Sequence, residues 1–269
     1  MSMIAYFFGG ILTSLLVNVL LLRFSQSLGI RNKNDVTIRW SNHSKPSLGG
    51  ISFYIVFLFA GIIFPIFDYV NNIFHDPQFV ALFVGGALAF SMGLADDAYN
   101  TKPMVKLLVQ ISCGLLLWYG GAVLNITQYG WINGIATIFW VVLLMNSLNM
   151  LDNMDGITGM VCFCIILICQ CSLLFHNGFT YSIWLVLNFA ILGGLLGFLF
   201  HNVHPSKLFM GDAGSQVIGF YVAFMSITCI FNAEQIDVMT AINWKGLTLI
   251  AIAFAIPFAV KVAVLVFSS

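Results

Sequence analysis

Charged residues are scarce in this sequence. Only 7% of its 269 residues are Asp, Glu, Lys or Arg, whereas 60% are hydrophobic. Soluble domains carry roughly 25% charged residues, so a water-soluble fold could not cover this much apolar surface. The ten basic residues are also too few for a surface that follows a phosphate backbone, which argues against nucleic acid as a partner.

A cleavable signal peptide, coiled-coil heptads and low-complexity linkers are also lacking. The first apolar run begins at Met3 without a basic segment before it, and it ends at Leu22 without a small-residue cleavage site. Four of the six cysteines fall in the apolar run 161–174, which favours free thiols over a metal site or a disulfide framework. We therefore expect residues 1–269 to form a single membrane-embedded domain.

Long apolar runs are what the sequence does contain. Runs of about 20 apolar residues predict helices that cross a bilayer. The pattern predicts an all-α, polytopic integral membrane protein with about nine transmembrane helices. The expected spans are residues 3–22, 48–67, 79–95, 107–124, 131–148, 157–175, 181–200, 213–231 and 246–267.

Lysine and arginine predict how these spans are oriented. Half of all basic residues lie in the loop after the first span: Arg23, Arg31, Lys33, Arg39 and Lys45. Positively charged loops stay in the cytoplasm, so the N-terminus is expected outside and every second loop inside. We expect a multi-pass protein of the bacterial inner (cytoplasmic) membrane.

Acidic residues gather at three places, each at the predicted cytoplasmic end of a span. Asp96 and Asp97 form the first group, Asp152 and Asp155 the second, and Asp212 the third. We expect them in tight turns. Singly, each is best interpreted as a helix cap or a solvated loop residue. Together they would repel one another unless a cation lay among them, and oxygen ligands favour Mg²⁺, with Mn²⁺ as the alternative.

Glycine-rich segments open two of the predicted spans. Residues 211–215 open the eighth span and residues 45–50 open the second, the latter with Lys45. Backbone N–H groups at a helix N-terminus bind anions, so we expect a phosphate-bearing ligand to approach there. Glycines also serve helix packing in membranes, and that interpretation stays open.

The ordered motifs resemble the polyprenyl-phosphate N-acetylhexosamine-1-phosphate transferases. The resemblance rests on residues 45–50, on Asp96-Asp97 with residues 106–110, on residues 149–156 and on residues 202–215. Among bacterial members, the chain is more similar to the UDP-GlcNAc:undecaprenyl-phosphate GlcNAc-1-phosphate transferases than to the phospho-MurNAc-pentapeptide transferases. The resemblance implies transfer of a HexNAc-1-phosphate from a UDP-sugar to undecaprenyl phosphate, with release of UMP, at the cytoplasmic face of the membrane.

The resemblance also implies roles for individual residues. Asp96 and Asp97 match the catalytic aspartate pair, and Asn149 and Asp212 match the Mg²⁺ ligands. The remaining matches are to substrate-binding positions: Lys45, Lys106, Asp152, Asp155, Asn202 and Phe209. A homodimer is left open.

Two family features are absent from this sequence. No histidine follows His204, although the family has a histidine-rich loop before its last span, and Pro257 is followed by Phe258 instead of an acidic residue. The alternative is therefore a truncated, catalytically impaired relative that binds a UDP-sugar or polyprenyl phosphate. A transporter is disfavoured because the acids gather at one face. His201 and His204 could be a metal pair, but an interfacial or substrate-contacting role is favoured.

Overall fold

The computed structural model describes residues 3–24, 46–67, 73–177 and 182–231. The ninth predicted span and Lys45 lie outside these ranges. Within them the chain is helical, and no β-strand occurs there. The α-helices are α1 (Met3–Phe24), α2 (Gly50–Phe67), α3 (Pro77–Tyr99), α4 (Pro103–Tyr119), α5 (Gly130–Leu151), α6 (Ile157–Asn177), α7 (Ile183–Asn202) and α8 (Gly211–Ser226). A short 3-10 helix (Ile73–His75) precedes α3, and a π-helical turn (Ile227–Phe231) continues α8.

Local chemistry explains where several helices begin and end. The Asp76 side chain caps α3 by accepting a hydrogen bond from the Gln78 N–H at 2.9 Å, and Pro77 occupies the first helical position. At the other end of α3, Asn100 adopts a left-handed conformation (φ 51°), which ends the helix. Pro103 then starts α4. The connection between α3 and α4 is therefore a tight turn.

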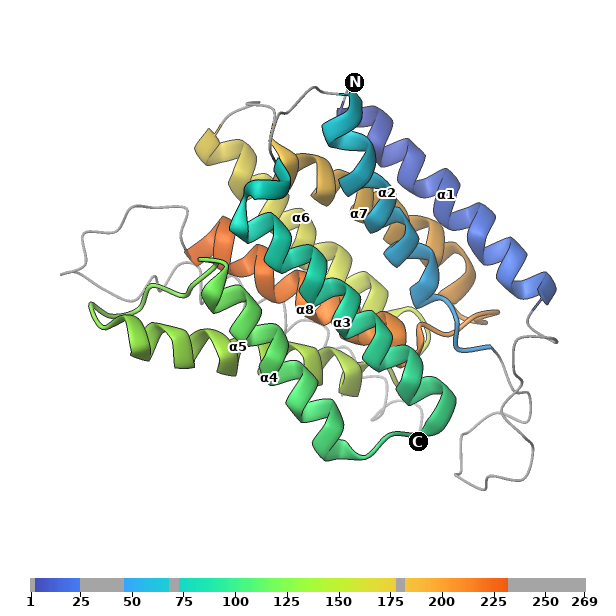
Figure 1. Cartoon of the computed structure of the whole chain (residues 1–269). Helices are drawn as coiled ribbons and strands as arrows, with labels where there is room; N and C mark the ends of the chain where they lie inside the picture. Colours follow the sequence, from blue (N-terminus) through green and yellow to red (C-terminus); the bar gives the residue numbers. More distant parts are fainter. Residues whose placement is uncertain (1–2, 25–45, 68–72, 178–181, 232–269) are drawn as a thin grey trace, which may run out of the picture.

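Helix α8 lies at the centre of the bundle (Figure 1). It packs against α2, α3, α5 and α6, and Asp212 is the one residue of α8 that is not buried. Helices α1 and α2 pack against α7 on one side, and α4 packs against α3 and α5 on the other. Asp212, in the first turn of α8, is thus held by the most buried helix of the described residues.

The structure confirms an all-α polytopic membrane protein. Within the described ranges, five helices are long and apolar enough to cross a membrane: α1, α3, α5, residues Ile157–Phe175 of α6, and α7. Helices α2 and α4 are apolar but shorter. The count of nine spans and the orientation with the N-terminus outside remain predictions. The cysteines in 161–174 are free thiols, as the sequence indicated.

One local expectation was wrong. The aspartate pair was expected in a turn after a span ending at residue 95, but α3 continues to Tyr99 and places Asp96 and Asp97 in its last turn. Asn149 likewise belongs to α5, which continues to Leu151. Helical backbone fixes the direction of these side chains more tightly than a loop would, and that matters for the site they form.

Candidate active site

The end of α3 fixes Asp96 through the turn that follows it. Thr101 donates two hydrogen bonds to Asp96 Oδ1, from its backbone N–H at 2.8 Å and from its hydroxyl at 2.6 Å. Lys106 Nζ lies 2.9 Å from the other oxygen, Oδ2. Both oxygens of Asp96 therefore have partners, and hydrogen bonds of this kind stabilise the ionised form of a carboxylate.

Asp97 caps a helix distant in sequence. Its Oδ1 accepts the Asp212 N–H at 3.0 Å and its Oδ2 accepts the Ala213 N–H at 2.9 Å. These groups belong to the first turn of α8, whose own N-cap residue, Met210, provides no side-chain cap. A carboxylate at a helix N-terminus satisfies orphan N–H groups and complements the helix dipole. Asp97 thus joins α3 to α8.

The expectation that a ligand anion binds these N–H groups is therefore wrong for Asp212 and Ala213. A similar correction holds for α2, where the N–H groups of Gly49 and Gly50 donate to the carbonyls of Phe209 and Met210, each at 2.9 Å. Protein groups already satisfy these donors, so the two glycine-rich segments serve packing and not anion binding at these positions.

Two glycines permit this close contact between helices. A Cβ added at Gly93 would lie 2.4 Å from the Asp212 carbonyl oxygen and 2.5 Å from Ala213 Cα. Gly211 has a φ of +79°, and a Cβ there would meet the Ser47 carbonyl oxygen at 2.4 Å. A side chain at Gly93 would push α8 away from α3, and one at Gly211 would push the start of α8 away from the segment before α2.

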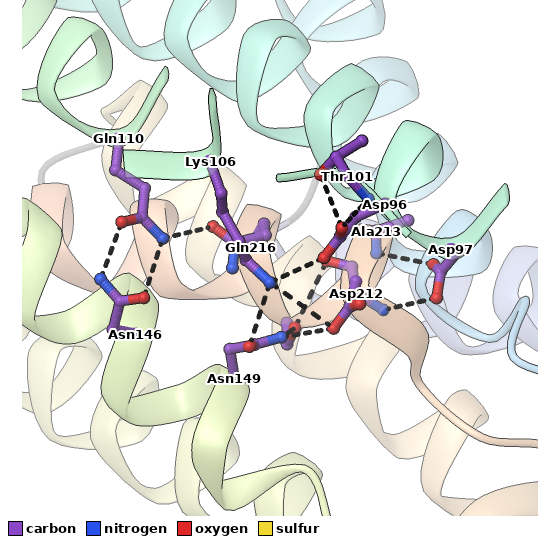
Figure 2. A network of polar contacts seen from close by, with 11 residues as sticks. Asp96, Asp97, Thr101, Lys106, Gln110, Asn146, Asn149, Asp212, Ala213 and Gln216 are labelled. Atoms are coloured by element: carbon purple, nitrogen blue, oxygen red, sulfur yellow. Dashed lines mark hydrogen bonds and ion pairs between the residues drawn. The ribbon is translucent and has the colours of Figure 1, made fainter. Parts of the chain in front are cut away.

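Oxygen atoms from three helices converge on one ammonium group (Figure 2). Lys106 Nζ lies 2.9 Å from Asp96 Oδ2, 3.2 Å from Asn149 Oδ1 and 3.9 Å from Asp212 Oδ1. The Asn149 amide nitrogen donates to Asp212 Oδ1 at 2.5 Å and to Ser215 Oγ at 2.8 Å. This group, which we call the carboxylate cluster (Asp96, Lys106, Asn149 and Asp212), joins α3, α4, α5 and α8.

A layer of amide side chains lies one helical turn further along three of the same helices. Gln110 Nε2 donates to Asn146 Oδ1 at 3.2 Å and to Gln216 Oε1 at 3.1 Å, and Asn146 Nδ2 donates back to Gln110 Oε1 at 2.7 Å (Figure 2). Residues three or four apart lie on one face of a helix. The amide layer therefore fixes the register of α4, α5 and α8 beneath the carboxylate cluster.

Asp152 follows α5 and adds a further carboxyl group close by. Burial raises the pKa of its carboxyl group from 3.8 to about 8, and the charges of Asp212 and Asp97 act in the same direction. A carboxyl group with a raised pKa indicates surroundings that disfavour additional negative charge. A bound cation would reverse this effect.

The pKa of Asp152 gives a pH prediction. An aspartate with a raised folded-state pKa stabilises the fold below its unfolded pKa, and this contribution disappears as the pH rises through the folded value. In the absence of divalent cations, Asp152→Asn should therefore raise the thermal unfolding temperature relative to wild type, and the difference should grow between pH 5 and pH 8. Thermal unfolding in detergent at several pH values measures it. A difference independent of pH would contradict the expectation.

A second group of polar contacts joins the loop before α6 to the end of α7 and the segment that follows it. The Asn202 side chain accepts the Gly156 N–H at 3.0 Å and donates to the Leu208 carbonyl at 2.8 Å. Asp155 Oδ2 accepts the Ser206 N–H at 3.2 Å and lies 3.2 Å from His204 Nδ1. Asn202 thus links the loop after α5 to the loop before α8.

The structure brings together Asp96, Asp97, Lys106, Asn149 and Asp212, with Asp152 close enough for its titration to depend on Asp97 and Asp212. Asp155 and Asn202 belong to the separate group of contacts between the loop before α6 and the segment after α7. Phe209 is half-buried, and its backbone pairs with Pro46 and Gly49.

Sequence reasoning did not identify Thr101, Ser215 or the amide layer. The signal for the amide layer was present, because Gln110 and Gln216 lie four residues after Lys106 and Asp212, and Asn146 lies three before Asn149.

The donor atoms fit a hard divalent cation. Asp96, Asn149 and Asp212 offer carboxylate and amide oxygens, which are the ligands of Mg²⁺, and a positive ammonium group already lies among them. In the described ranges no group of three or more His, Cys, Asp and Glu residues could hold a metal. A zinc-type site is therefore not found there, and His201 instead lies 3.4 Å from the Gly197 carbonyl within its own helix.

Comparison with known proteins identifies the family. The sequence profile of glycosyl transferase family 4 matches residues 79–230, which include every residue of the carboxylate cluster and the amide layer. The chain belongs to glycosyl transferase family 4. The resemblance that the sequence motifs indicated is thereby confirmed.

Individual members of glycosyl transferase family 4 show what the chain is similar to. It is 25% identical over 221 residues to a probable undecaprenyl-phosphate N-acetylglucosaminyl 1-phosphate transferase of Bacillus subtilis, covering 78% of this chain and 59% of that relative. It is 29% identical over 202 residues to a phospho-N-acetylmuramoyl-pentapeptide-transferase of Thermoanaerobacter sp. (68% and 60%). A decaprenyl-phosphate N-acetylglucosaminephosphotransferase of Mycolicibacterium smegmatis is 27% identical over 230 residues (79% and 55%). The aligned regions thus cover less than two thirds of the length of these relatives.

Proposed function

We propose that this chain transfers a HexNAc-1-phosphate, and specifically GlcNAc-1-phosphate, from a UDP-sugar to undecaprenyl phosphate. UMP would leave, and the lipid-linked product would begin a cell-envelope glycan. The observation that supports this most is the convergence of Asp96, Asn149 and Asp212 oxygens around one ammonium group at the ends of membrane helices. The relatives from B. subtilis and M. smegmatis are named for the same class of transfer.

The reaction joins two anions, and electrostatics is therefore the main task of the site. An oxygen of the acceptor phosphate attacks the β-phosphorus of the UDP-sugar, the bond from that phosphorus to the bridging oxygen breaks, and UMP leaves with the electron pair. The second pKa of a phosphate monoester is about 6, so the acceptor is largely ionised near neutral pH and needs little help from a general base.

The residues of the carboxylate cluster would hold the cation. Asp212 and Asn149 are proposed as its ligands, and Asp96 supplies a further oxygen facing the same ammonium group. Mg²⁺, or Mn²⁺ in its place, would neutralise the diphosphate and so stabilise the charge that develops in the transition state. Lys106 is proposed to pair with the diphosphate.

Asp97 is proposed to act differently from Asp96. Because both its oxygens accept N–H groups of α8, its carboxylate positions Asp212 instead of receiving a proton from the acceptor. The uridine would lie toward the second group, where Asp155 and Phe209 are proposed contacts and Asn202 holds the two loops together. Lys45 lies outside the described residues and stays a proposed substrate contact on the strength of its motif. Asp152 is proposed as a further substrate contact, and the whole site is proposed to face the cytoplasm.

Release of UMP tests the proposal. The purified chain would be incubated with UDP-GlcNAc, undecaprenyl phosphate and Mg²⁺, and UMP would be measured. We expect UMP only when both substrates and the divalent ion are present, and none after addition of EDTA. Binding of UDP-GlcNAc without any UMP release would contradict the enzyme proposal and favour a binding protein that has lost the transfer step. UDP-GalNAc in a parallel reaction tests the choice of sugar.

A further inference from the structure

The Lys106 ammonium group occupies the point at which the oxygens of the carboxylate cluster converge. It belongs to the first turn of α4, which begins at Pro103, and its distances to Asp96 Oδ2, Asn149 Oδ1 and Asp212 Oδ1 are 2.9, 3.2 and 3.9 Å. Its contacts come from three other helices. The geometry is that of a cation surrounded by oxygen ligands, with the ammonium group in the place of a metal ion.

A divalent cation bound by the same oxygens cannot share this space with the ammonium group. Mg²⁺ holds its oxygen ligands at about 2.0–2.1 Å, so Asp212 and Asn149 would have to close around the ion where Nζ now lies. An ammonium group a few ångströms from Mg²⁺ would also repel it strongly in a partly desolvated site. The two cations are therefore alternatives.

The surroundings of Lys106 allow it to leave. Its side chain keeps 17% of its surface exposed, so one side of the ammonium group can reach solvent. A lysine side chain has a flexible four-carbon stem and three rotatable donors, which suits it to exchange partners without moving the helix. Asp96 would keep its two hydrogen bonds from Thr101 after the lysine had left.

We propose that Lys106 is an exchangeable counter-ion of the metal site. In the metal-free protein it holds Asp96, Asn149 and Asp212 together and prevents their repulsion. When a divalent ion enters, the ammonium group leaves and becomes available to an anionic ligand. This inference rests on the proposed function, because it takes the carboxylate cluster as the cation site. On this inference the lysine competes with the metal ion for the same oxygens. A lysine in a permanent structural ion pair would not compete.

Metal binding by the full-length chain in detergent tests the inference. Mn²⁺ would be the probe, with its free concentration measured by electron paramagnetic resonance. Lys106→Gln removes the competing charge, so we expect its dissociation constant for Mn²⁺ to fall by about tenfold or more relative to wild type. Lys106→Arg retains a competing charge and should bind Mn²⁺ no more tightly than wild type. Lys102→Gln is the matched control, because it changes the net charge equally from an exposed position at the N-cap of the same helix.

Thermal unfolding gives an independent readout. Without divalent ions, Lys106→Gln should unfold at a lower temperature than wild type, and saturating Mg²⁺ should restore most of the difference because the ion replaces the lost ammonium group. Equal or weaker Mn²⁺ binding by Lys106→Gln would overturn the exchange while leaving the proposed metal site intact. Absence of Mn²⁺ binding in wild type and in every variant would overturn both.

Discussion

Replacing Asp212 with asparagine should lower the rate of UMP release by about a thousandfold or more. Loss of a single charged or hydrogen-bonding group that stabilises the transition state costs about 10²–10³ in rate, and here the lost charge also weakens cation binding. The substitution keeps an oxygen that can accept the hydrogen bond from Asn149 Nδ2. The backbone N–H that binds Asp97 is unchanged. The fold should therefore survive.

The rate of UMP release and the unfolding temperature would both be measured for Asp212→Asn. Asp76→Asn is the matched control, because it makes the same change at the N-cap of α3, at the opposite end of that helix from Asp96. The control should retain wild-type activity. If Asp212→Asn kept more than a tenth of the wild-type rate at saturating Mg²⁺, the assignment of Asp212 to the cation site would be wrong.

The Asp97→Ala variant should lose both stability and activity. It removes two hydrogen bonds at the start of α8 and leaves the N–H groups of Asp212 and Ala213 without their acceptor. A lost N-cap costs about 0.5–2 kcal/mol, and hydrogen bonds to a charged group are worth about 1.5–3 kcal/mol. We expect a stability loss of about 2–3 kcal/mol and a rate lower by about a hundredfold, because Asp212 stands on the first turn of the uncapped helix.

Graded substitutions separate this role from catalysis by proton transfer. Asp97→Asn keeps one acceptor oxygen, so its stability and its rate should both lie between those of wild type and Asp97→Ala. Ser182→Ala provides the control, because Ser182 caps α7 through one longer bond of 3.4 Å to the Leu185 N–H and should cost less than about 1 kcal/mol. If Asp97→Asn unfolded at the wild-type temperature yet had no activity, Asp97 would act in the chemical step and not in positioning α8.

Most of the membrane architecture could be predicted from the sequence because it depends on local hydropathy. The starts of α1 and α6 and the end of α2 agree with the predicted spans. The ends of α3 and α5 were not predicted, since the expected spans stopped at residues 95 and 148, whereas the helices continue through Asp97 and Asn149. A polar residue ends an apolar run but not a helix, when its side chain has partners on neighbouring helices.

The candidate site was predictable as a set of residues but not as a set of contacts. Motif order pointed to Asp96, Asn149 and Asp212, and the structure places their oxygens around one lysine. That Asp97 caps α8 could not be read from the sequence, because its partners are 115 and 116 residues away. Hydrogen-bond partners across such distances depend on helix packing, which hydropathy does not encode.

The bond between α3 and α8 has a consequence for how the protein is made. The ribosome synthesises α3 before α8. The first partner of Asp97, the Asp212 N–H, is made 115 residues after Asp97 itself. Until then Asp97 lacks the helix that it caps, and α8 can pack against α3 and α5 only after both have been synthesised. The carboxylate cluster is therefore complete only after the first turn of α8 has been synthesised, because Asp212 is the last of its four residues in the chain.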